Sequence, residues 1–274
     1  MLSGEDIRLE LGRGLIFFPY DPQELQGSTY NLKVGEFVWL HPAAQGPGRP
    51  DTLPMAGVLR NGRREFDIPP SSTVSVLTRE IIFLDHAFGG LVHSKVGVVT
   101  QGFSHVSTTL DPGWIGPLLI TMQNASPRVL VLQRDATFVT LTFFRLSSPT
   151  ALRRSNPTAR TDLLRYMRFL VDAGEGNEWE HFSRGVYSDV DDLRRAFRTS
   201  PEGQGVEAAQ RAAQDAQRAT RTRWLRWGRR GILALATFGV LALIAYVSQS
   251  NLATLLVAIP GLLAFLDFVR RNWT

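Results

Sequence analysis

The sequence contains no cysteine and only two lysines, and from Gly231 to Leu266 it has no charged side chain. The absence of cysteine excludes disulfide bonds, thiol nucleophiles and cysteine-ligated zinc or iron–sulfur sites. Of the 274 residues, 44% are hydrophobic and 10% are aromatic, which excludes a collagen-like or wholly disordered protein. A chain of this length forms one or two domains and can bury a sizeable core.

Residues 1–149 are rich in short apolar segments that are separated by Gly, Pro, Asn and Asp. Segments of this kind are typical of strands, and together they predict a mainly-β barrel or sandwich. We expect strands at Glu36–Leu40, Thr73–Thr78, Leu91–Thr100, Pro117–Gln123, Val129–Leu132 and Thr137–Leu146. Ser3 is a good N-cap, so a helix should open the chain and end at Gly12. The polar, Pro- and Gly-rich stretch 43–62 is expected to be a surface loop.

The second half of the chain predicts three further regions: a mixed helical extension at 150–205, an arginine-rich helical stalk at 206–230 and an apolar hairpin at 231–274. In the extension we expect helices at Asp162–Ala173 and Asp189–Thr199. Alanine, glutamine and arginine from Val206 to Trp227 favour one continuous helix, because none of them breaks helices.

The apolar hairpin consists of two segments, about 231–247 and 252–268, that are close to the lower length limit for transmembrane helices. Six arginines in 218–230 precede it, and Arg270, Arg271 and Trp273 follow the second segment. Flanking arginine and tryptophan predict a two-span protein of the inner (cytoplasmic) membrane with both termini in the cytoplasm, in contact with membrane lipids. Two alternatives are a buried helical hairpin in a soluble domain and a nucleic-acid patch in the arginine stretch; we expect no nucleic-acid partner. The acidic start of the chain argues against an N-terminal signal peptide.

Several short sequence segments of the N-terminal half resemble segments of the dCTP deaminases and occur in the same order as in that family. The first two are the opening Met1-Leu2-Ser3 with Asp6-Ile7-Arg8, and Phe18, Asp21-Pro22 with Gln26 to Gly35. The others are Ile68-Pro69-Pro70 with Thr78-Arg79-Glu80, Leu84 and Gly90, then Ser94 to Gly97, Leu110 to Gly116 and Asn124. The resemblance covers about 1–148 and implies a dUTPase-like (dCTP deaminase-type) β-barrel, in a homotrimer with nucleotide sites between subunits.

The resemblance also assigns roles to single positions. The family's catalytic glutamate, which handles protons during deamination, corresponds to Thr121, and a required arginine corresponds to Val98. The serine near the activated water is retained as Ser94. The remaining nucleotide-binding positions correspond to His93, Lys95, His105 and Asp111. With the glutamate and arginine replaced, the sequence assigns no catalytic residue.

Each of these residues also has a purely structural interpretation. His93 and Lys95 could line an ordinary strand edge, although a lysine also serves as a point charge for a phosphate. Asp111 lies in an Asp-Pro-Gly sequence that forms a turn on its own account. His86 and His105 have no partners at metal-ligand spacing, so we expect no metal site and no cofactor, with Mg²⁺ only as the companion of a nucleoside triphosphate.

Three hypotheses for function follow. The leading one is a membrane-anchored, catalytically inactive dCTP deaminase-like protein that binds a pyrimidine deoxynucleotide or other nucleotide and acts as a sensor or effector, for example in bacterial defence. The second is an active membrane-tethered dCTP deaminase, or a dUTPase (dUTP diphosphatase), in pyrimidine deoxynucleotide metabolism. The third is a trimeric membrane scaffold that uses the barrel only to assemble.

Overall fold

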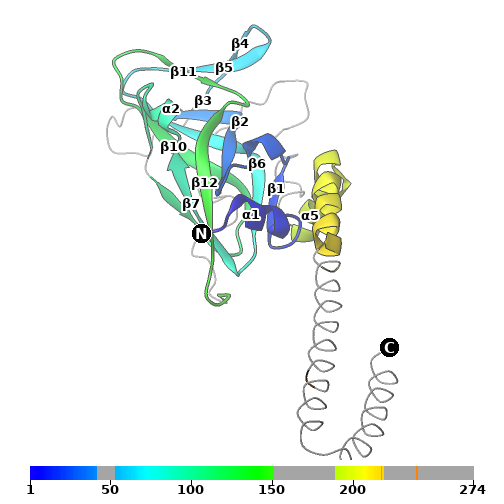
Figure 1. Cartoon of the computed structure of the whole chain (residues 1–274). Coiled ribbons are helices and arrows are strands. Elements are labelled where there is room, and N and C mark those ends of the chain that lie inside the picture. Colours follow the sequence, from blue (N-terminus) through cyan, green and yellow to red (C-terminus); the bar gives the residue numbers. More distant parts are fainter. Residues whose placement is uncertain (42–52, 106, 151–188, 217, 219–238, 240–274) are drawn as a thin grey trace, which may run out of the picture. The chain divides into compact units, whose positions relative to one another are not determined.

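The computed structural model describes residues 1–41, 53–105, 107–150, 189–216, 218 and 239 (Figure 1). The chain divides into two compact units, Met1–Gln210 and Arg211–Thr274. The first unit contains every strand that the structure describes and the candidate site, and it is described here by itself.

The chain opens with helix α1 (Gly4–Glu10), and its start is fixed by a capping box. The Ser3 hydroxyl accepts a hydrogen bond from the Asp6 amide at 3.1 Å, and the Asp6 carboxylate accepts one from the Ser3 amide at 2.9 Å. These bonds satisfy two amides that have no partner within the helix. The Leu2 amide donates to the carbonyl of Phe143 at 2.8 Å and ties the helix to the sheet. The predicted opening helix is confirmed.

The described strands form two antiparallel sheets, so the mainly-β prediction is confirmed. The larger has nine strands: β1 (Leu15–Phe18), β2 (Thr29–His41), β3 (Leu53–Pro54), β6 (Thr73–Leu84), β7 (Phe88–Ser94), β8 (Phe103–His105), β9 (Thr108–Leu110), β10 (Ile115–Asn124) and β12 (Thr137–Arg145). Its main order is β8-β10-β6-β2-β12-β7-β9. The smaller has the order β11 (Leu130–Gln133), β5 (Arg63–Ile68) and β4 (Val58–Arg60). The larger sheet curls (Figure 1). Strand β8, at one end of the order, also contacts β7.

Apolar side chains from both sheets and from α1 make one core. At its centre Phe17 stacks on Tyr30 with 4.4 Å between ring centroids and packs against Phe143 at 5.3 Å. All three rings are fully buried. Rings of this size dominate the burial energy of a small core. The contacts between these three rings therefore hold β1, β2 and β12 together.

Two sequence expectations need correction. The predicted strand Leu91–Thr100 ends at Ser94, where its pairing with β12 stops, and Val96–Val99 form the short helix α2 instead. The predicted loop 43–62 contains β3 and β4 in its described part. Strand β4 forms a hairpin with β5 because Asn61 and Gly62 both take positive φ, the geometry that a two-residue hairpin turn requires.

Helix α5 (Val190–Thr199) packs against β1, as Figure 1 also shows. Asp189 caps it by accepting from the Asp191 amide at 2.8 Å, and the fully buried ring of Phe197 lies 6.2 Å from Tyr20. Residues 201–216 are helical. Within that helix the Gln210 amide group donates to the carbonyls of Arg8 at 2.7 Å and Leu11 at 3.1 Å. These carbonyls lie at the end of α1, so Gln210 caps that helix from a distant part of the chain.

The expected helix at Asp189–Thr199 is therefore confirmed, and the expected helix at Val206–Trp227 is helical over 206–216. The expected helix at Asp162–Ala173 and both predicted transmembrane segments, 231–247 and 252–268, lie outside the described residues, with the exception of Gly239. Among the helices that the structure describes, none has the length and apolar character needed to span a membrane.

Candidate functional site

Three of the predicted nucleotide-binding residues follow one another where β7 ends. His93 and Ser94 are the last residues of β7 and pair with Thr140 and Val139 of β12. Lys95 is the N-cap residue of α2, and its ammonium donates to the Thr137 hydroxyl at 2.8 Å. No carboxylate in the described part of the chain pairs with Lys95. Its ammonium therefore keeps hydrogen-bonding capacity for an anionic ligand.

Helix α2 that follows is apolar on its exposed side. Val96 and Val99 are 78% and 47% exposed, whereas Val98 is partly buried against the core. Val98, expected at the family's arginine position, thus packs inward and offers no charge to a ligand.

Thr121 lies on β10 with its side chain exposed, and its hydroxyl is part of a hydrogen-bonded chain across three strands. The Thr121 and Ser75 hydroxyl oxygens are 2.9 Å apart, and the Ser75 hydroxyl is 2.7 Å from Nε2 of His41. Strands β2, β6 and β10 are neighbours, and Ser75 pairs with both Trp39 and Thr121. Burial lowers the pKa of the half-buried His41, so its imidazole is neutral near pH 7.

The two remaining predicted residues, His105 and Asp111, lie in different parts of the larger sheet. His105 is in β8, and its backbone pairs with Met122, next to Thr121. Asp111 follows β9 in a turn that the Trp114 amide closes by donating to the Asp111 carbonyl at 3.2 Å. In the antiparallel pairing of β9 with β7, Leu110 lies opposite Gly90, so Asp111 lies at the end of β7 away from His93. Because β8 also contacts β7 and α2, the curl brings the strand of His105 toward the segment His93–Lys95.

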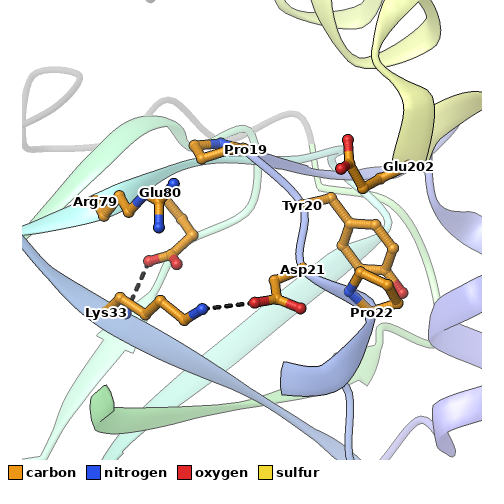
Figure 2. A pocket seen from close by; sticks show the side chains of 8 residues that line it. All are labelled: Pro19, Tyr20, Asp21, Pro22, Lys33, Arg79, Glu80 and Glu202. Atoms are coloured by element: carbon orange, nitrogen blue, oxygen red, sulfur yellow. Dashed lines mark hydrogen bonds and ion pairs between the residues drawn. The ribbon is translucent and has the colours of Figure 1, made fainter. Parts of the chain in front are cut away.

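A separate pocket of about 270 Å³ lies between β1, β2, β6 and the helix at 201–216 (Figure 2). Its lining residues are Pro19, Tyr20, Asp21, Pro22, Lys33, Arg79, Glu80 and Glu202. The Lys33 ammonium is 2.6 Å from a carboxylate oxygen of Asp21 and 3.3 Å from one of Glu24. The hydrogen bond from Lys33 lowers the pKa of Asp21.

Glu80 in the same pocket is the one charged residue that is fully buried among the described residues, at 1% exposure. Its carboxylate accepts a hydrogen bond from the Lys33 amide at 2.9 Å, yet burial raises the pKa of Glu80 to about 7. Glu80 is five residues from Ser75 along β6, which corresponds to roughly 17 Å at about 3.4 Å per residue. This carboxylate therefore cannot stand in for a base beside Thr121.

Sequence reasoning missed His41 and Ser75, which are 34 residues apart and contact each other only because β2 pairs with β6. Asp21, Lys33 and Glu80 lie in segments that carry the family resemblance, but the resemblance assigned them no role. Across the described ranges, no group of three His, Asp or Glu side chains is arranged to hold a metal ion.

Comparison with known proteins now places the chain. The family model described as dCTP deaminase-like matches residues 1–146, more than half of the sequence. The chain belongs to the dCTP deaminase-like family. The resemblance of the sequence phrases is thereby confirmed at the level of the family.

Curated relatives agree with this assignment. The dCTP deaminase of Pyrococcus abyssi is 26% identical over 51% of this chain and 82% of its own length. The dCTP deaminase of Thermococcus kodakarensis is 28% identical over 54% and 85%. A dCTP deaminase of the dUMP-forming kind from Acidothermus cellulolyticus is 26% identical over 54% and 82%. About half of the present dCTP deaminase-like chain has no counterpart in these relatives.

Among solved structures, the dCTP deaminase of Agrobacterium tumefaciens is similar at 17% identity and a TM-score of 0.40. The similarity covers 52% of this chain and 46% of that one, so the chain matches less than half of that protein. The dUTPase of Streptococcus mutans is similar at 15% identity and a TM-score of 0.34, over 51% of this chain and 100% of that one.

Proposed function

We propose that this dCTP deaminase-like domain binds a pyrimidine deoxynucleotide without deaminating it, and that binding regulates a membrane-anchored C-terminal part. The observation that carries the proposal is the position of Thr121. Where the family resemblance expects a catalytic glutamate, an exposed threonine hydroxyl is bound to Ser75.

Hydrolytic deamination needs a base that takes a proton from water and passes it to the ring and the leaving ammonia. A threonine hydroxyl is far too weak a base near neutral pH, and Val98 replaces the expected arginine with an apolar side chain. The carboxylates of Asp21, Glu24 and Glu80 gather around Lys33 instead. Among the described residues no carboxylate is hydrogen-bonded to Thr121, which supports binding without deamination.

Binding groups remain where catalytic groups are missing. The Lys95 ammonium has no carboxylate partner among the described residues, and a lysine of this kind attracts phosphate as a point charge. His93 and Ser94 lie at the same strand end as Lys95, whereas Asp111 lies in the turn at the other end of β7. We infer a homotrimer with nucleotide sites between subunits, and Mg²⁺ only as the companion of a bound triphosphate.

The C-terminal part supplies the proposed membrane anchor. The apolar segments 231–247 and 252–268, flanked by arginine and tryptophan, support a two-span hairpin in the inner membrane with cytoplasmic termini. The contacts of Phe197 with Tyr20 and of Gln210 with the end of α1 connect the nucleotide domain to the helix that leads toward this hairpin. We propose a sensor or effector role, including one in bacterial defence, for a nucleotide domain connected in this way.

The test uses the full-length protein in detergent micelles. Isothermal titration with dCTP, dUTP and ribonucleotide controls measures binding, and ammonia release in the same samples measures deamination. We expect binding of a deoxynucleotide with no ammonia and no pyrophosphate. If no nucleotide binds at millimolar concentration, the proposal is refuted, and the barrel is left as a trimeric scaffold.

The second candidate is an active membrane-tethered deaminase, and one observation favours it. The neutral imidazole of His41 is connected to Thr121 through Ser75, and it could accept a proton that arrives through the two hydroxyls. Ammonia release from dCTP that disappears in Thr121→Val would establish this candidate. Pyrophosphate release from dUTP would indicate a dUTPase.

A further inference from the structure

The chain His41–Ser75–Thr121 connects a half-buried titratable group to an exposed hydroxyl. Ser75 is 1% exposed, so solvent does not compete for its hydrogen bonds. His41 is half-buried and lies on the same face of β2 as Trp39, which is fully buried and stacks on Phe37 at 5.8 Å. These apolar neighbours explain why the imidazole resists protonation.

Each hydroxyl in this chain has a single proton to donate, and that fact couples the three groups. In the neutral tautomer of His41 that carries its proton on Nδ1, Nε2 is an acceptor, so Ser75 donates to it and Thr121 donates to Ser75. The lone pairs of Thr121 then face outward as acceptors. When His41 is protonated, Nε2 donates to Ser75, Ser75 donates to Thr121, and the proton of Thr121 faces outward.

We propose that His41, acting through Ser75, sets the hydrogen-bond polarity of the Thr121 hydroxyl, so that its proton is available to a carbonyl of a pyrimidine only while Nε2 of His41 carries a proton, and an exocyclic amine is favoured while it does not. A cytosine-type base presents such an amine, whereas a uracil-type base presents a carbonyl that accepts from the Thr121 proton. The inference rests on the proposed function, because it needs a nucleotide base beside Thr121. His41 and Ser75 act here as positioning residues that touch no ligand themselves.

Few charged groups lie on the strands around His41. On its own strand Glu36 is paired with Arg134, and on β6 Arg79 is paired with Asp135 at 3.1 Å. The other titratable residues are Lys33 on β2, Glu80 on β6 and His105 on β8, while β10 carries no charged residue. Burial alone accounts for the lowered pKa of His41, so its titration is separable from theirs.

The experiment compares two nucleotides that differ only at the base. Isothermal titration of the full-length protein in detergent with dCTP and with dUTP, from pH 8 to pH 5.5, gives the ratio of the two dissociation constants. Ionisation of the phosphates affects both nucleotides alike and cancels in this ratio. We expect the preference for dCTP over dUTP to fall roughly threefold to tenfold on acidification, the loss of one hydrogen bond.

Two variants and one control sharpen the test. His41→Gln keeps a hydrogen-bonding group for Ser75 but does not titrate, so the ratio should become independent of pH. Thr121→Val removes only the exposed hydroxyl and should have the same effect; it carries the test if His41→Gln does not fold. His86→Gln, at an exposed histidine beside Gly113 and away from the His41–Ser75–Thr121 chain, should behave as the wild type.

The outcomes separate the inference from the proposed function. A ratio that is constant with pH while both nucleotides bind would overturn the role of His41 and leave nucleotide binding intact. The same conclusion follows if either site variant keeps the pH dependence of the wild type. The absence of all nucleotide binding at every pH would overturn both.

Discussion

Replacing Glu80 with glutamine should stabilise the protein increasingly as the pH rises from 4.5 to 7. The side chain is 1% exposed, and burial raises the pKa of Glu80 from 4.5 to about 7. In this window the folded protein keeps a proton on Glu80, whereas the unfolded chain has released it. Stability therefore falls with rising pH, and the loss is complete above about pH 7.

The magnitude follows from the size of the shift. A change from 4.5 to about 7 corresponds to about 3 kcal/mol, since one pKa unit is worth about 1.4 kcal/mol. The amide of Glu80→Gln has the same shape and can accept the same hydrogen bond from the Lys33 amide, but it does not titrate. The stability difference between the variant and the wild type should therefore grow by about 3 kcal/mol across the window.

The assay is urea unfolding of the full-length protein in detergent, followed by the circular dichroism of the β-sheet at several pH values. Measuring the difference between two proteins cancels the titration of every other group. Glu202→Gln is the matched control, because it removes a carboxylate from the same pocket at an exposed position and should show little of this rise. A difference for Glu80→Gln that stays flat from pH 4.5 to 7.5 would refute the reasoning, since burial would then not penalise the charged carboxylate.

Three further predictions concern helix docking, the nucleotide site and the membrane. Phe197→Ala should remove about 3–5 kcal/mol of packing and expose α5 to trypsin, unlike Thr199→Ala at an exposed position; equal cleavage of both variants would contradict the docking role. Lys95→Met should weaken nucleotide binding about tenfold through loss of a charge-assisted hydrogen bond, and unchanged affinity in titration calorimetry would remove Lys95 from the site. The full chain should sediment with membranes after a carbonate wash while a chain ending at Gln210 should not; equal behaviour of the two would refute the C-terminal anchor.

Much of the fold could be predicted from local patterns. The helix at the start of the chain depends on Ser3 and Asp6, which satisfy the same amides whatever surrounds them. The long strands β2, β6, β10 and β12 each include a segment that apolar runs and turn residues had indicated. Helix α2 was missed because its valines favour strands, and pairing with β12 ends before them.

Only some residues of the candidate site could be predicted from local patterns. The order of the family phrases identified the family and drew attention to Thr121, Lys95 and Asp111. The partners of Thr121 were not accessible, because Ser75 is 46 residues away and His41 reaches the site only through the pairing of β2 with β6. The burial that raises the pKa of Glu80 likewise depends on a pocket lined by distant segments, including Glu202.

The sequence by itself determined the family, the opening helix, the strand-rich character of the first half and the absence of thiol chemistry. These follow from residue types and short spacings, which act over a few neighbouring positions. Only the tertiary structure decided that the Ser75 hydroxyl contacts the imidazole of His41 and that the Glu80 carboxylate is buried. Such contacts depend on the pairing of strands that are far apart along the chain, and neither composition nor periodicity records that pairing.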